Sequence, residues 1–575
     1  MIILGINAYH GDSAACLVKD GLLICALEEE RIRRVKHWSG FPSESIKWCL
    51  SYAGIDAKDV DYVAVNRDPL ARMHLKLFNV LKRGVSREFF ARRLENYSKI
   101  SRIKTSLAGI YNLSYSGIKA KVINVEHHKA HVAGSFFVSP FKQAAFASID
   151  GFGDFASTTI GLADGNRISV KGEVIFPNSL GIFYSALTQF LGFWNYGDEY
   201  KIMGLCAYGK PVYADKLKKI IRFKKDGLFE LDSSYFLHDK NSVDMTWLNG
   251  YPTIGRLFSD KLINLLGEQR GESQNIDERF QNLAASLQWV YESAFFHILN
   301  NLYKKTKLEN LVLSGGCIQN SLANGKIYER TSFKNVYIPP AAHDAGGCIG
   351  AAYYVWNKIL GQPKKFVLDS AYLGPDYSDN NIKDLLNELN LEYEYLKEEE
   401  LIKRAAGYIV NGKIIGWFQG WTEWGPRALG NRSILVDPRR EEMKEILNAR
   451  IKKREWFRPF APSILEDKVG EWFENAEPVP FMEKVYKIKE EKRSAIPAVC
   501  HSDGTGRLQT VKERINPRYY SLIKEFAVLT GVPIILNTSF NENEPIVNTP
   551  LEAIQCFLKT GVDLLVIGNY IVNQS

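Results

Sequence analysis

The chain has 575 residues, a length at which one hydrophobic core usually gives way to two or more domains. Hydrophobic residues make up 46% and charged residues 24%, which fits a globular protein and excludes collagen-like, coiled-coil and disordered classes. No uninterrupted apolar stretch approaches the roughly 20 residues of a membrane helix, and no basic region opens the chain as in a signal peptide. The chain has eight cysteines and no Cys-x-x-Cys pair, which argues against a disulfide framework and a structural zinc site. Together these observations lead us to expect a cytoplasmic protein with no membrane partner.

The net charge of +8 is concentrated in one segment. Between Arg67 and Lys121 there are thirteen basic and three acidic residues. Such a segment can be a solvated helical face, a lid over an anionic ligand or a nucleic-acid surface. No pattern of a known RNA-binding or DNA-binding module is present, so nucleic acid is not favoured as a partner.

Apolar runs near the start of the chain predict strands at residues 2–6, 14–18 and 22–27, with turns between them. A second set begins at 144–149, reaches an acidic glycine-containing turn and continues at 158–162. Both sets follow one plan of strand, acidic turn and strand. This duplication predicts two related α/β lobes.

The pattern changes once along the chain. Residues 276–305 predict a long amphipathic helix, and proline-bearing sequence between 361 and 376 then interrupts the regular elements. A new α/β region begins near 400 and includes a predicted strand at 414–418. We therefore predict one domain at 1–360, a linker at 361–400 and a second domain at 401–575.

Three of the ten histidines lie close together, at His127, His128 and His131. His127 and His131 are four residues apart, so on a helix they share a face and can bind one metal ion. Asp150 and Asp344, both in glycine-rich turns, can complete such a site. This donor set suits Fe(II) as well as Zn, and the alternative is a helical surface that is rich in histidine without a metal.

Two glycine turns follow apolar strands, one at Ser314-Gly315-Gly316 and one at Asp344-Ala345-Gly346-Gly347. Glycines at such places let backbone amides approach phosphate or ribose, and a helix N-terminus adds a favourable dipole. A single turn of this kind is usually only a tight turn. Two in series favour a nucleotide site.

The second half of the chain contains a dense set of cations with polar residues behind them. These are Arg427, Arg432, Lys452, Arg454, Arg458 and Arg507, followed by Asn537, Ser539 and Asn541. Arginine binds phosphate oxygens in a bidentate manner. Structural ion pairs with Glu423, Asp437 and Glu455 are the alternative. A loop that carries two arginines among Trp, Phe and Pro favours a dry anion pocket.

Ten ordered motifs support a family resemblance: GINAYHGDSAA, EEERIRRVKH, EHHKAH, DGFGD, GDEYKIMGLCAYG, LSGGCIQN, HDAGGCIGAA, EWGPRALGNRS, KKREWFRPFAP and NTSFNENEPI. With them the chain resembles, over essentially its whole length, the carbamoyltransferase family that includes the nodulation, cephalosporin and tobramycin O-carbamoyltransferases. One departure is Gly11, which is inserted where many members read HDSA.

The resemblance implies a two-lobed actin-like ATPase (Kae1-like) N-terminal domain and an α/β YrdC-like C-terminal domain. It also implies a two-step enzyme. The C-terminal domain makes carbamoyl adenylate and pyrophosphate from carbamoyl phosphate and ATP. The N-terminal domain passes the carbamoyl group to a hydroxyl of a small-molecule or natural-product acceptor and releases AMP. A homodimer is left open.

Site residues follow from the resemblance. It implies Fe(II), with Zn as the alternative, on His127, His131, Asp150 and Asp344, and Mg²⁺ with ATP in the C-terminal domain, where the cations and polar residues named above bind carbamoyl phosphate and ATP. The residues expected to border the nucleotide in the N-terminal domain are Gly151, Gly153, Lys201, Gly204, Ser314, Gly315, Gly316, Asn320 and Gly346. An acceptor hydroxyl needs a base, for which His10 is the first choice, with Asp12 and Lys36 as further catalytic residues.

Two other functions compete with this one. A sugar kinase on an actin-like fold would make ADP, and it leaves the arginines of the second half unexplained. A tRNA-modifying or RNA-binding protein would use the basic segment 67–121 and bind RNA with strong salt dependence. Neither explains both halves of the chain.

Overall fold

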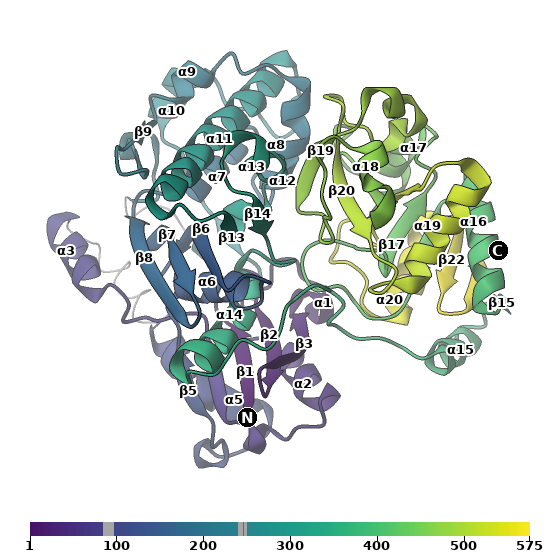
Figure 1. Ribbon diagram of the computed structural model, residues 1–575, viewed down its shortest axis with the longest axis horizontal. Coiled ribbons are helices and arrows are strands. Elements are labelled where there is room, and N and C mark those ends of the chain that lie inside the picture. The colour runs from purple at the N-terminus through teal and green to yellow at the C-terminus, as the bar shows by residue number, and fades with distance from the viewer. Residues whose placement is uncertain (84–96, 240–244, 247–249, 575) are drawn as a thin grey trace. The chain divides into compact units, whose positions relative to one another are not determined.

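The computed structural model describes residues 1–83, 97–239, 245–246 and 250–574 (Figure 1). The chain divides into two compact units. Unit 1 comprises Met1–Asn320 and Ile327–Leu368, and unit 2 comprises Ser321–Lys326 and Asp369–Ser575. Both units combine helices with strands, which confirms the predicted α/β class. No helix in the described part of the chain is long and apolar enough to cross a membrane.

The first lobe of unit 1 is built on a five-stranded sheet. Its strands in spatial order are β3 (Leu22–Glu28), β2 (Ala14–Lys19), β1 (Ile2–Asn7), β4 (Tyr62–Val65) and β5 (Lys121–Asn124). The first three pair antiparallel, and β4 and β5 extend the sheet in parallel. Parallel neighbours need crossover connections, which here include α2 (Ser43–Tyr52) and α5 (Ile103–Ile110). Apolar side chains of both helices enter one core with the sheet.

The second lobe repeats this topology. Its strands in spatial order are β8 (Arg167–Ile175), β7 (Ala156–Asp164), β6 (Gln143–Gly153), β13 (Asn310–Ser314) and β14 (Asn335–Tyr337). Three strands again pair antiparallel, and two again extend the sheet in parallel. Each lobe therefore has the strand order 3-2-1-4-5 when its own strands are numbered along the chain. This confirms the predicted duplication into two related α/β lobes.

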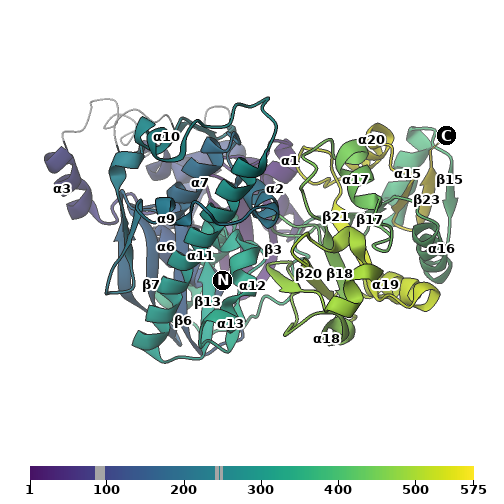
Figure 2. The ribbon, with the colours of Figure 1, turned by 90° about the horizontal axis from the view of Figure 1, so that it is seen from above.

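Helices cover these sheets and connect them (Figures 1 and 2). Those of unit 1 that remain to be named are α1 (Glu30–Arg33), α3 (Met73–Arg83), α6 (His127–Phe136), α7 (Leu180–Phe190), α8 (Glu199–Leu205), α9 (Ala214–Leu217), α10 (Asp260–Leu266), α11 (Glu278–Thr306), α13 (Ile327–Arg330) and α14 (Gly347–Tyr353). The predicted helix at 276–305 is α11, which Asp277 caps by accepting a hydrogen bond from the Phe280 N–H. Short strands also occur, namely β9 (Ile221–Phe223), β10 (Phe229–Leu231), β11 (Met245–Thr246) and β12 (Thr253–Ile254).

Unit 2 is organised around a nine-stranded mixed sheet. Its order is β15 (Tyr393–Tyr395), β23 (Tyr570–Asn573), β22 (Leu564–Ile567), β16 (Ile415–Phe418), β17 (Arg432–Val436), β21 (Ile534–Ser539), β18 (Ala461–Leu465), β20 (Thr505–Val511) and β19 (Lys484–Lys487). Its helices are α12 (Ser321–Gly325), α15 (Asp379–Glu388), α16 (Glu398–Val410), α17 (Met443–Ile446), α18 (Val469–Trp472), α19 (Pro517–Thr530) and α20 (Pro550–Thr560). The central strands are buried along their whole length because helices and loops cover both faces of the sheet.

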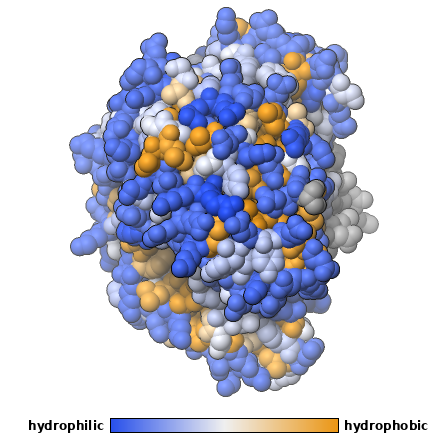
Figure 3. Space-filling view, turned by 90° about the vertical axis from the view of Figure 1, so that its right-hand side faces the viewer, coloured by the Kyte–Doolittle hydropathy of each residue, from blue (hydrophilic) through white to orange (hydrophobic). Residues whose placement is uncertain are grey.

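Residues 361–400, for which the sequence predicted a linker, contain regular structure in unit 2. Helix α15 and strand β15 both lie there, and β15 pairs with β23. Ile382 and Leu386 of α15 are buried in the core of unit 2. On the face shown in Figure 3, hydrophobic side chains occur in small groups among hydrophilic ones, as on most protein surfaces.

Candidate functional site

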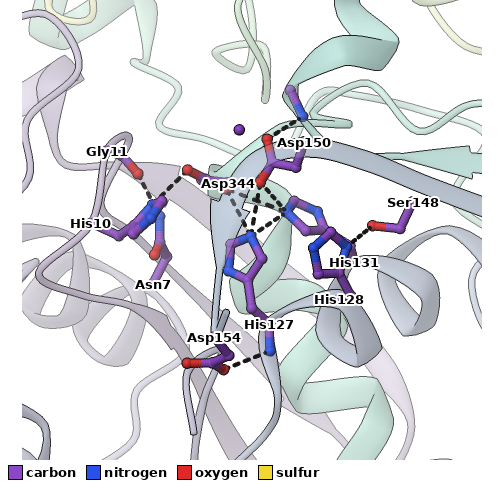
Figure 4. A network of polar contacts seen from close by, with 12 residues as sticks. Asn7, His10, Gly11, His127, His128, His131, Ser148, Asp150, Asp154 and Asp344 are labelled. Carbon is purple, nitrogen blue, oxygen red and sulfur yellow. Dashed lines mark hydrogen bonds and ion pairs between the residues drawn. The ribbon is translucent and has the colours of Figure 1, made fainter. Parts of the chain in front are cut away.

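Helix α6 presents two histidines to the interior of unit 1. Glu126 caps the helix by accepting hydrogen bonds from the His128 and Lys129 amides, and Arg72 holds the Glu126 carboxylate at 2.9 Å. His127 and His131 are one turn apart and point in the same direction (Figure 4). The helical spacing expected from the sequence is therefore present.

Two carboxylates face these imidazoles, one from Asp150 in β6 and one from Asp344 in the short 3₁₀ helix before α14. His127 Nε2 lies 2.9 Å from Asp150 Oδ2 and 3.5 Å from Asp344 Oδ1. His131 Nε2 lies 3.5 Å and 3.2 Å from the same two oxygens. The two Nε2 atoms are 3.1 Å apart. All four side chains are at least nine-tenths buried.

These spacings fit the coordination shell of one divalent ion. Ligand atoms about 2.1 Å from an ion are about 3.0 Å apart at right angles and about 3.4 Å apart in a tetrahedron. The observed separations of 2.9–3.5 Å span these two values. Two imidazoles and two carboxylates also form a donor set that suits Fe(II) and Zn. The cluster can therefore bind a metal.

The second oxygen of each carboxylate is held by the protein. Asp150 Oδ1 accepts a hydrogen bond from the Gly316 N–H at 2.9 Å. Asp344 Oδ2 forms an ion pair with His10 Nδ1 at 2.6 Å. Such outer contacts fix the orientation of metal ligands. His10, predicted as a base, thus also positions a candidate ligand.

Charges within the cluster shift the pKa values of its members. Burial lowers the pKa of His131, but the Asp150 and Asp344 carboxylates outweigh it and raise that pKa to about 9. Burial opposes ionisation of Asp150, yet His127 and His131 hold its pKa well below the usual range. The proton on His131 thus offsets the charge of the carboxylates when no metal is present.

Asp12, another predicted catalytic residue, forms a second ion pair beside the cluster. Its Oδ1 lies 2.7 Å from His37 Nδ1, and its Oδ2 lies 3.8 Å from His343 Nε2. Burial lowers the pKa of His37, but Asp12 outweighs it and raises that pKa to about 9. Asp12, Glu30 and His37 also bring one ligand atom each within 4.8 Å of one another. Lys36 is half-buried and directly precedes His37.

Several glycines predicted to border a nucleotide pack tightly around the cluster. A Cβ atom at Gly153 would lie 2.0 Å from the ring of His127, and one at Gly346 would lie 2.0 Å from a backbone carbonyl oxygen. Gly315 has a φ of +94°, which a side chain rarely tolerates. Glycine at these positions is required by the packing of the site itself.

The other residues predicted for the nucleotide have varied settings. Asn320 Nδ2 donates to Gln288 Oε1 at 2.9 Å, and Lys201 pairs with Asp198 at 3.0 Å. The remaining three belong to β6, α8 and the end of β13, and they are Gly151, Gly204 and Ser314.

Four of the predicted arginines form one electrostatic cluster in unit 2. Burial lowers the pKa of Arg507, and the guanidinium groups of Arg427, Arg454 and Arg458 lower it further. Arg507 Nε is buried and has no hydrogen-bond partner in the part of the chain that the structure describes. Glu455 pairs with Arg458 at 3.2 Å. Several positively charged groups close together are typical of a site that binds an anion.

Arg432 and Lys452 differ from these four in that backbone carbonyl oxygens surround their cations. Arg432 is fully buried, stacks over Phe418 and donates to backbone carbonyl oxygens, among them Gln419 at 2.5 Å and Pro375 at 3.1 Å. Lys452 is likewise buried and donates to carbonyl oxygens of the loop after β21. Both cations stabilise loops through these bonds, because a buried charge needs acceptors close by.

The predicted polar residues lie in β21 (Asn537 and Ser539) and directly after it (Asn541). Ser539 Oγ donates to Asn541 Oδ1 at 2.8 Å, and Asn541 Nδ2 donates to the Glu544 carbonyl at 2.6 Å. Asn537 donates to Gln509 Oε1 at 2.9 Å. Ser539 and Asn541 therefore shape the loop after the strand, while Asn537 connects β21 to β20.

Sequence reasoning missed His37 and Tyr196. The Tyr196 ring contacts His37 edge-on at 5.2 Å. Burial, followed by the nearby carboxylates of Asp12, Asp344 and Asp150, raises the pKa of the Tyr196 hydroxyl well above its usual range. The available signal was position, since His37 ends the motif EEERIRRVKH and Tyr196 directly precedes the motif GDEYKIMGLCAYG.

Two family models match this chain. Carbamoyltransferase N-terminus matches residues 2–353, and Carbamoyltransferase C-terminus matches residues 406–574.

Similar proteins match most of the chain. NolNO, a nodulation protein of Sinorhizobium fredii, is 37% identical and the match covers 99% of this chain and 80% of that protein. The uncharacterized protein sll1178 of Synechocystis sp. is 39% identical, with 100% and 97% covered. The nodulation protein NolO of Bradyrhizobium diazoefficiens is 38% identical, with 78% and 79% covered. Among solved structures, full-length HypF in the phosphate- and nucleotide-bound form matches with a TM-score of 0.30 and 14% identity, covering 62% of this chain and 55% of that one.

Proposed function

The chain belongs to the carbamoyltransferase family, and on that premise we propose that this transferase is an ATP-dependent O-carbamoyltransferase that works through carbamoyl adenylate. One observation carries the proposal, namely two charged sites of opposite character in a single chain, a buried one in unit 1 and a half-buried one in unit 2. Unit 1 has the His₂Asp₂ cluster, which suits a cation, and unit 2 has the cluster of four arginines, which suits an anion. A two-step reaction through an anionic intermediate would use both the cation site and the anion site.

The first step is proposed for unit 2. Carbamoyl phosphate and ATP repel each other because both are polyanions, and the guanidinium groups of Arg427, Arg454, Arg458 and Arg507 offset this repulsion. Mg²⁺ accompanies ATP. Atom balance requires water: carbamoyl phosphate, water and ATP give carbamoyl adenylate, inorganic phosphate and pyrophosphate. Water cleaves the bond between the carbamoyl and phosphate groups of carbamoyl phosphate, which releases inorganic phosphate and leaves carbamate. A carbamate oxygen then bonds to the α-phosphorus of ATP, and the bond from that phosphorus to the oxygen bridging it to the β-phosphate breaks, so that pyrophosphate leaves.

The second step is proposed for unit 1. The acceptor oxygen attacks the carbamoyl carbon, the bond from that carbon to the phosphate oxygen breaks, and AMP leaves. His10 takes the proton of the acceptor hydroxyl at Nε2, while Asp344 orients the ring through Nδ1. Asp12 and His37 form an ion pair at the same edge of the cluster, and Lys36 stabilises charge beside it. A divalent cation, Fe(II) or alternatively Zn, would supply Lewis acidity when bound by the four ligands.

Incubation with ATP and carbamoyl phosphate tests the proposal. Pyrophosphate and inorganic phosphate are expected in equal amounts and only when both substrates are present. Addition of a panel of hydroxyl compounds is expected to raise AMP release for those that serve as acceptors. Release of ADP without carbamoyl phosphate would instead support a sugar kinase.

A further inference from the structure

Gly11 stands between the two predicted catalytic residues His10 and Asp12, and one aromatic side chain lies directly on it. A Cβ atom at Gly11 would be 2.5 Å from the hydroxyl oxygen of Tyr196 and 3.0 Å from its Cζ. Any side chain at position 11 would therefore displace the tyrosine.

The turn that carries Gly11 is fixed in place. Asn7 is fully buried, and its Nδ2 donates to the Gly11 carbonyl at 2.9 Å and to the Asp12 carbonyl at 2.8 Å. Figure 4 shows Gly11 beside His10, whose imidazole points toward Asp344. The Tyr196 hydroxyl thus lies at the edge of the metal-ligand cluster.

A second glycine lets the same segment approach from the other side. Gly197 has a φ of +86°, and a Cβ atom there would lie 2.4 Å from His37 Nε2. His37 is held by Asp12 at 2.7 Å and contacts the Tyr196 ring. Two glycines therefore let Tyr196 lie against both the turn and the Asp12–His37 pair.

The surroundings favour a neutral phenol that donates a hydrogen bond. The Tyr196 hydroxyl lies in the field of three carboxylates, those of Asp12, Asp344 and Asp150, and it keeps its proton. A phenol near a centre that receives a phosphate can donate to that anion, and a hydrogen bond to a charged group is stronger than a neutral one.

We propose that Tyr196 is a further substrate-binding residue of unit 1, whose hydroxyl donates a hydrogen bond to the phosphate of the adenylate. This rests on the proposed function, in which an adenylate binds at the His₂Asp₂ cluster. Gly11 and Gly197 provide the room that the tyrosine needs.

The test compares the binding of AMP and adenosine, because only AMP carries the phosphate. In the full chain loaded with Zn²⁺, Tyr196→Phe is expected to raise the Kd for AMP roughly tenfold and to leave the Kd for adenosine unchanged. Tyr52→Phe, at a tyrosine of α2 that is 44% exposed, is the matched control and is expected to change neither. Both Kd values are then measured again, with and without Tyr196→Phe, in protein that also carries Arg458→Ala. This background reduces the contribution of the arginine cluster to AMP binding.

A double-mutant cycle sharpens the test. Gly11→Ala is expected to weaken AMP binding about as much as Tyr196→Phe does. The double variant is expected to have a Kd for AMP close to that of either single variant. Equal weakening of AMP and adenosine in Tyr196→Phe would overturn the proposal, since it would indicate a packing role. Unchanged AMP binding in that variant would overturn it as well. If the unaltered protein neither binds AMP nor forms pyrophosphate, the proposed function itself fails.

Discussion

The His₂Asp₂ cluster of unit 1 and the arginine cluster of unit 2 both bring like charges close together, but they differ in how the repulsion between those charges is relieved. In unit 1, His131 holds a proton with a pKa of about 9, and this charge offsets the two carboxylates. In unit 2, guanidinium groups keep their protons throughout the physiological range, so Arg507 faces three like charges. In unit 1, a proton can thus offset the charge of the carboxylates when no metal is bound. In unit 2, an anion from solution is needed to neutralise the guanidinium groups.

The largest expected effect separates the two sites by activity. Arg458→Ala removes a cation from the place where two polyanions must meet. Pyrophosphate formation is expected to fall by about 10²–10³-fold, as when one preorganised electrostatic contact is lost from an active site. Pyrophosphate release from ATP and carbamoyl phosphate is the measurement.

An exposed arginine of unit 2 is the matched control for this variant. Arg404 pairs with Glu394 on the surface, so Arg404→Ala is expected to leave pyrophosphate formation unchanged. Metal binding is expected to stay normal in both variants. If Arg404→Ala and Arg458→Ala lose activity alike, the arginine cluster has no special role.

The reciprocal variant is His131→Ala, which removes one of the four candidate ligands. Bound metal is expected to fall to well below one equivalent, and transfer to an acceptor is expected to drop by at least about 100-fold, since even loss of an outer contact costs up to that much. Pyrophosphate formation is expected to continue. Metal content and acceptor-dependent AMP release measure the two effects.

His128 provides the control on the same helix. Its Nδ1 lies 2.8 Å from Ser148 Oγ and does not face the cluster. His128→Asn is expected to keep its metal. Loss of pyrophosphate formation in His131→Ala would contradict the assignment of the two steps to different units.

Much of the fold could be predicted from local patterns. Apolar runs predicted three of the five strands of the first lobe, β1 to β3, and a helical period predicted α11. Strand pairing between distant segments, such as β6 with β13, depends on packing that no local window contains. The segment 361–400 was misleading because its prolines and glycines resemble a linker, while Ile382 and Leu386 bury one face of a short helix.

The candidate site could be predicted only where the spacing of residues along the chain determines their relative positions in space. His127 and His131 could be paired because a helix fixes residues four apart on one face. By contrast, Arg432 and Arg507 look alike in sequence, and only the backbone carbonyls around Arg432 distinguish a structural cation from one that can bind an anion. Tyr196 was missed because its contact with Gly11 joins segments far apart in the chain.

The third prediction concerns the pH dependence of metal binding in unit 1. Burial alone would lower the pKa of His131, but Asp150 and Asp344 raise it to about 9, so a metal must displace its proton at neutral pH. Apparent affinity for Zn²⁺ is expected to rise about tenfold per pH unit from about pH 7 to about pH 9 and then to level off. Competition with a chromophoric chelator measures it. A flat profile over this range would show that His131 carries no proton to displace.

The same proton also affects the stability of the metal-free protein. A pKa raised in the folded state stabilises the fold fully below the unfolded value of 6.5, and this stabilisation is lost as pH rises through about 9. The metal-free protein is therefore expected to melt lower at about pH 9.5 than at about pH 6.5. Added Zn²⁺ is expected to reduce the difference.

The smallest expected effect tests whether unit 2 depends on an anion. Inorganic phosphate at about 100 times its Kd is expected to raise the thermal unfolding midpoint by about 5 °C, because it binds the folded arginine cluster. Arg507→Met removes a half-buried charge from beside three others, so it is expected to raise the midpoint by about 2–4 °C without phosphate and to reduce the phosphate effect. Arg404→Met, at the exposed pair with Glu394, is the control that keeps the full phosphate effect. Equal stabilisation of all three proteins by phosphate would mean that the anion acts elsewhere, and the contrast between the two clusters would then be lost.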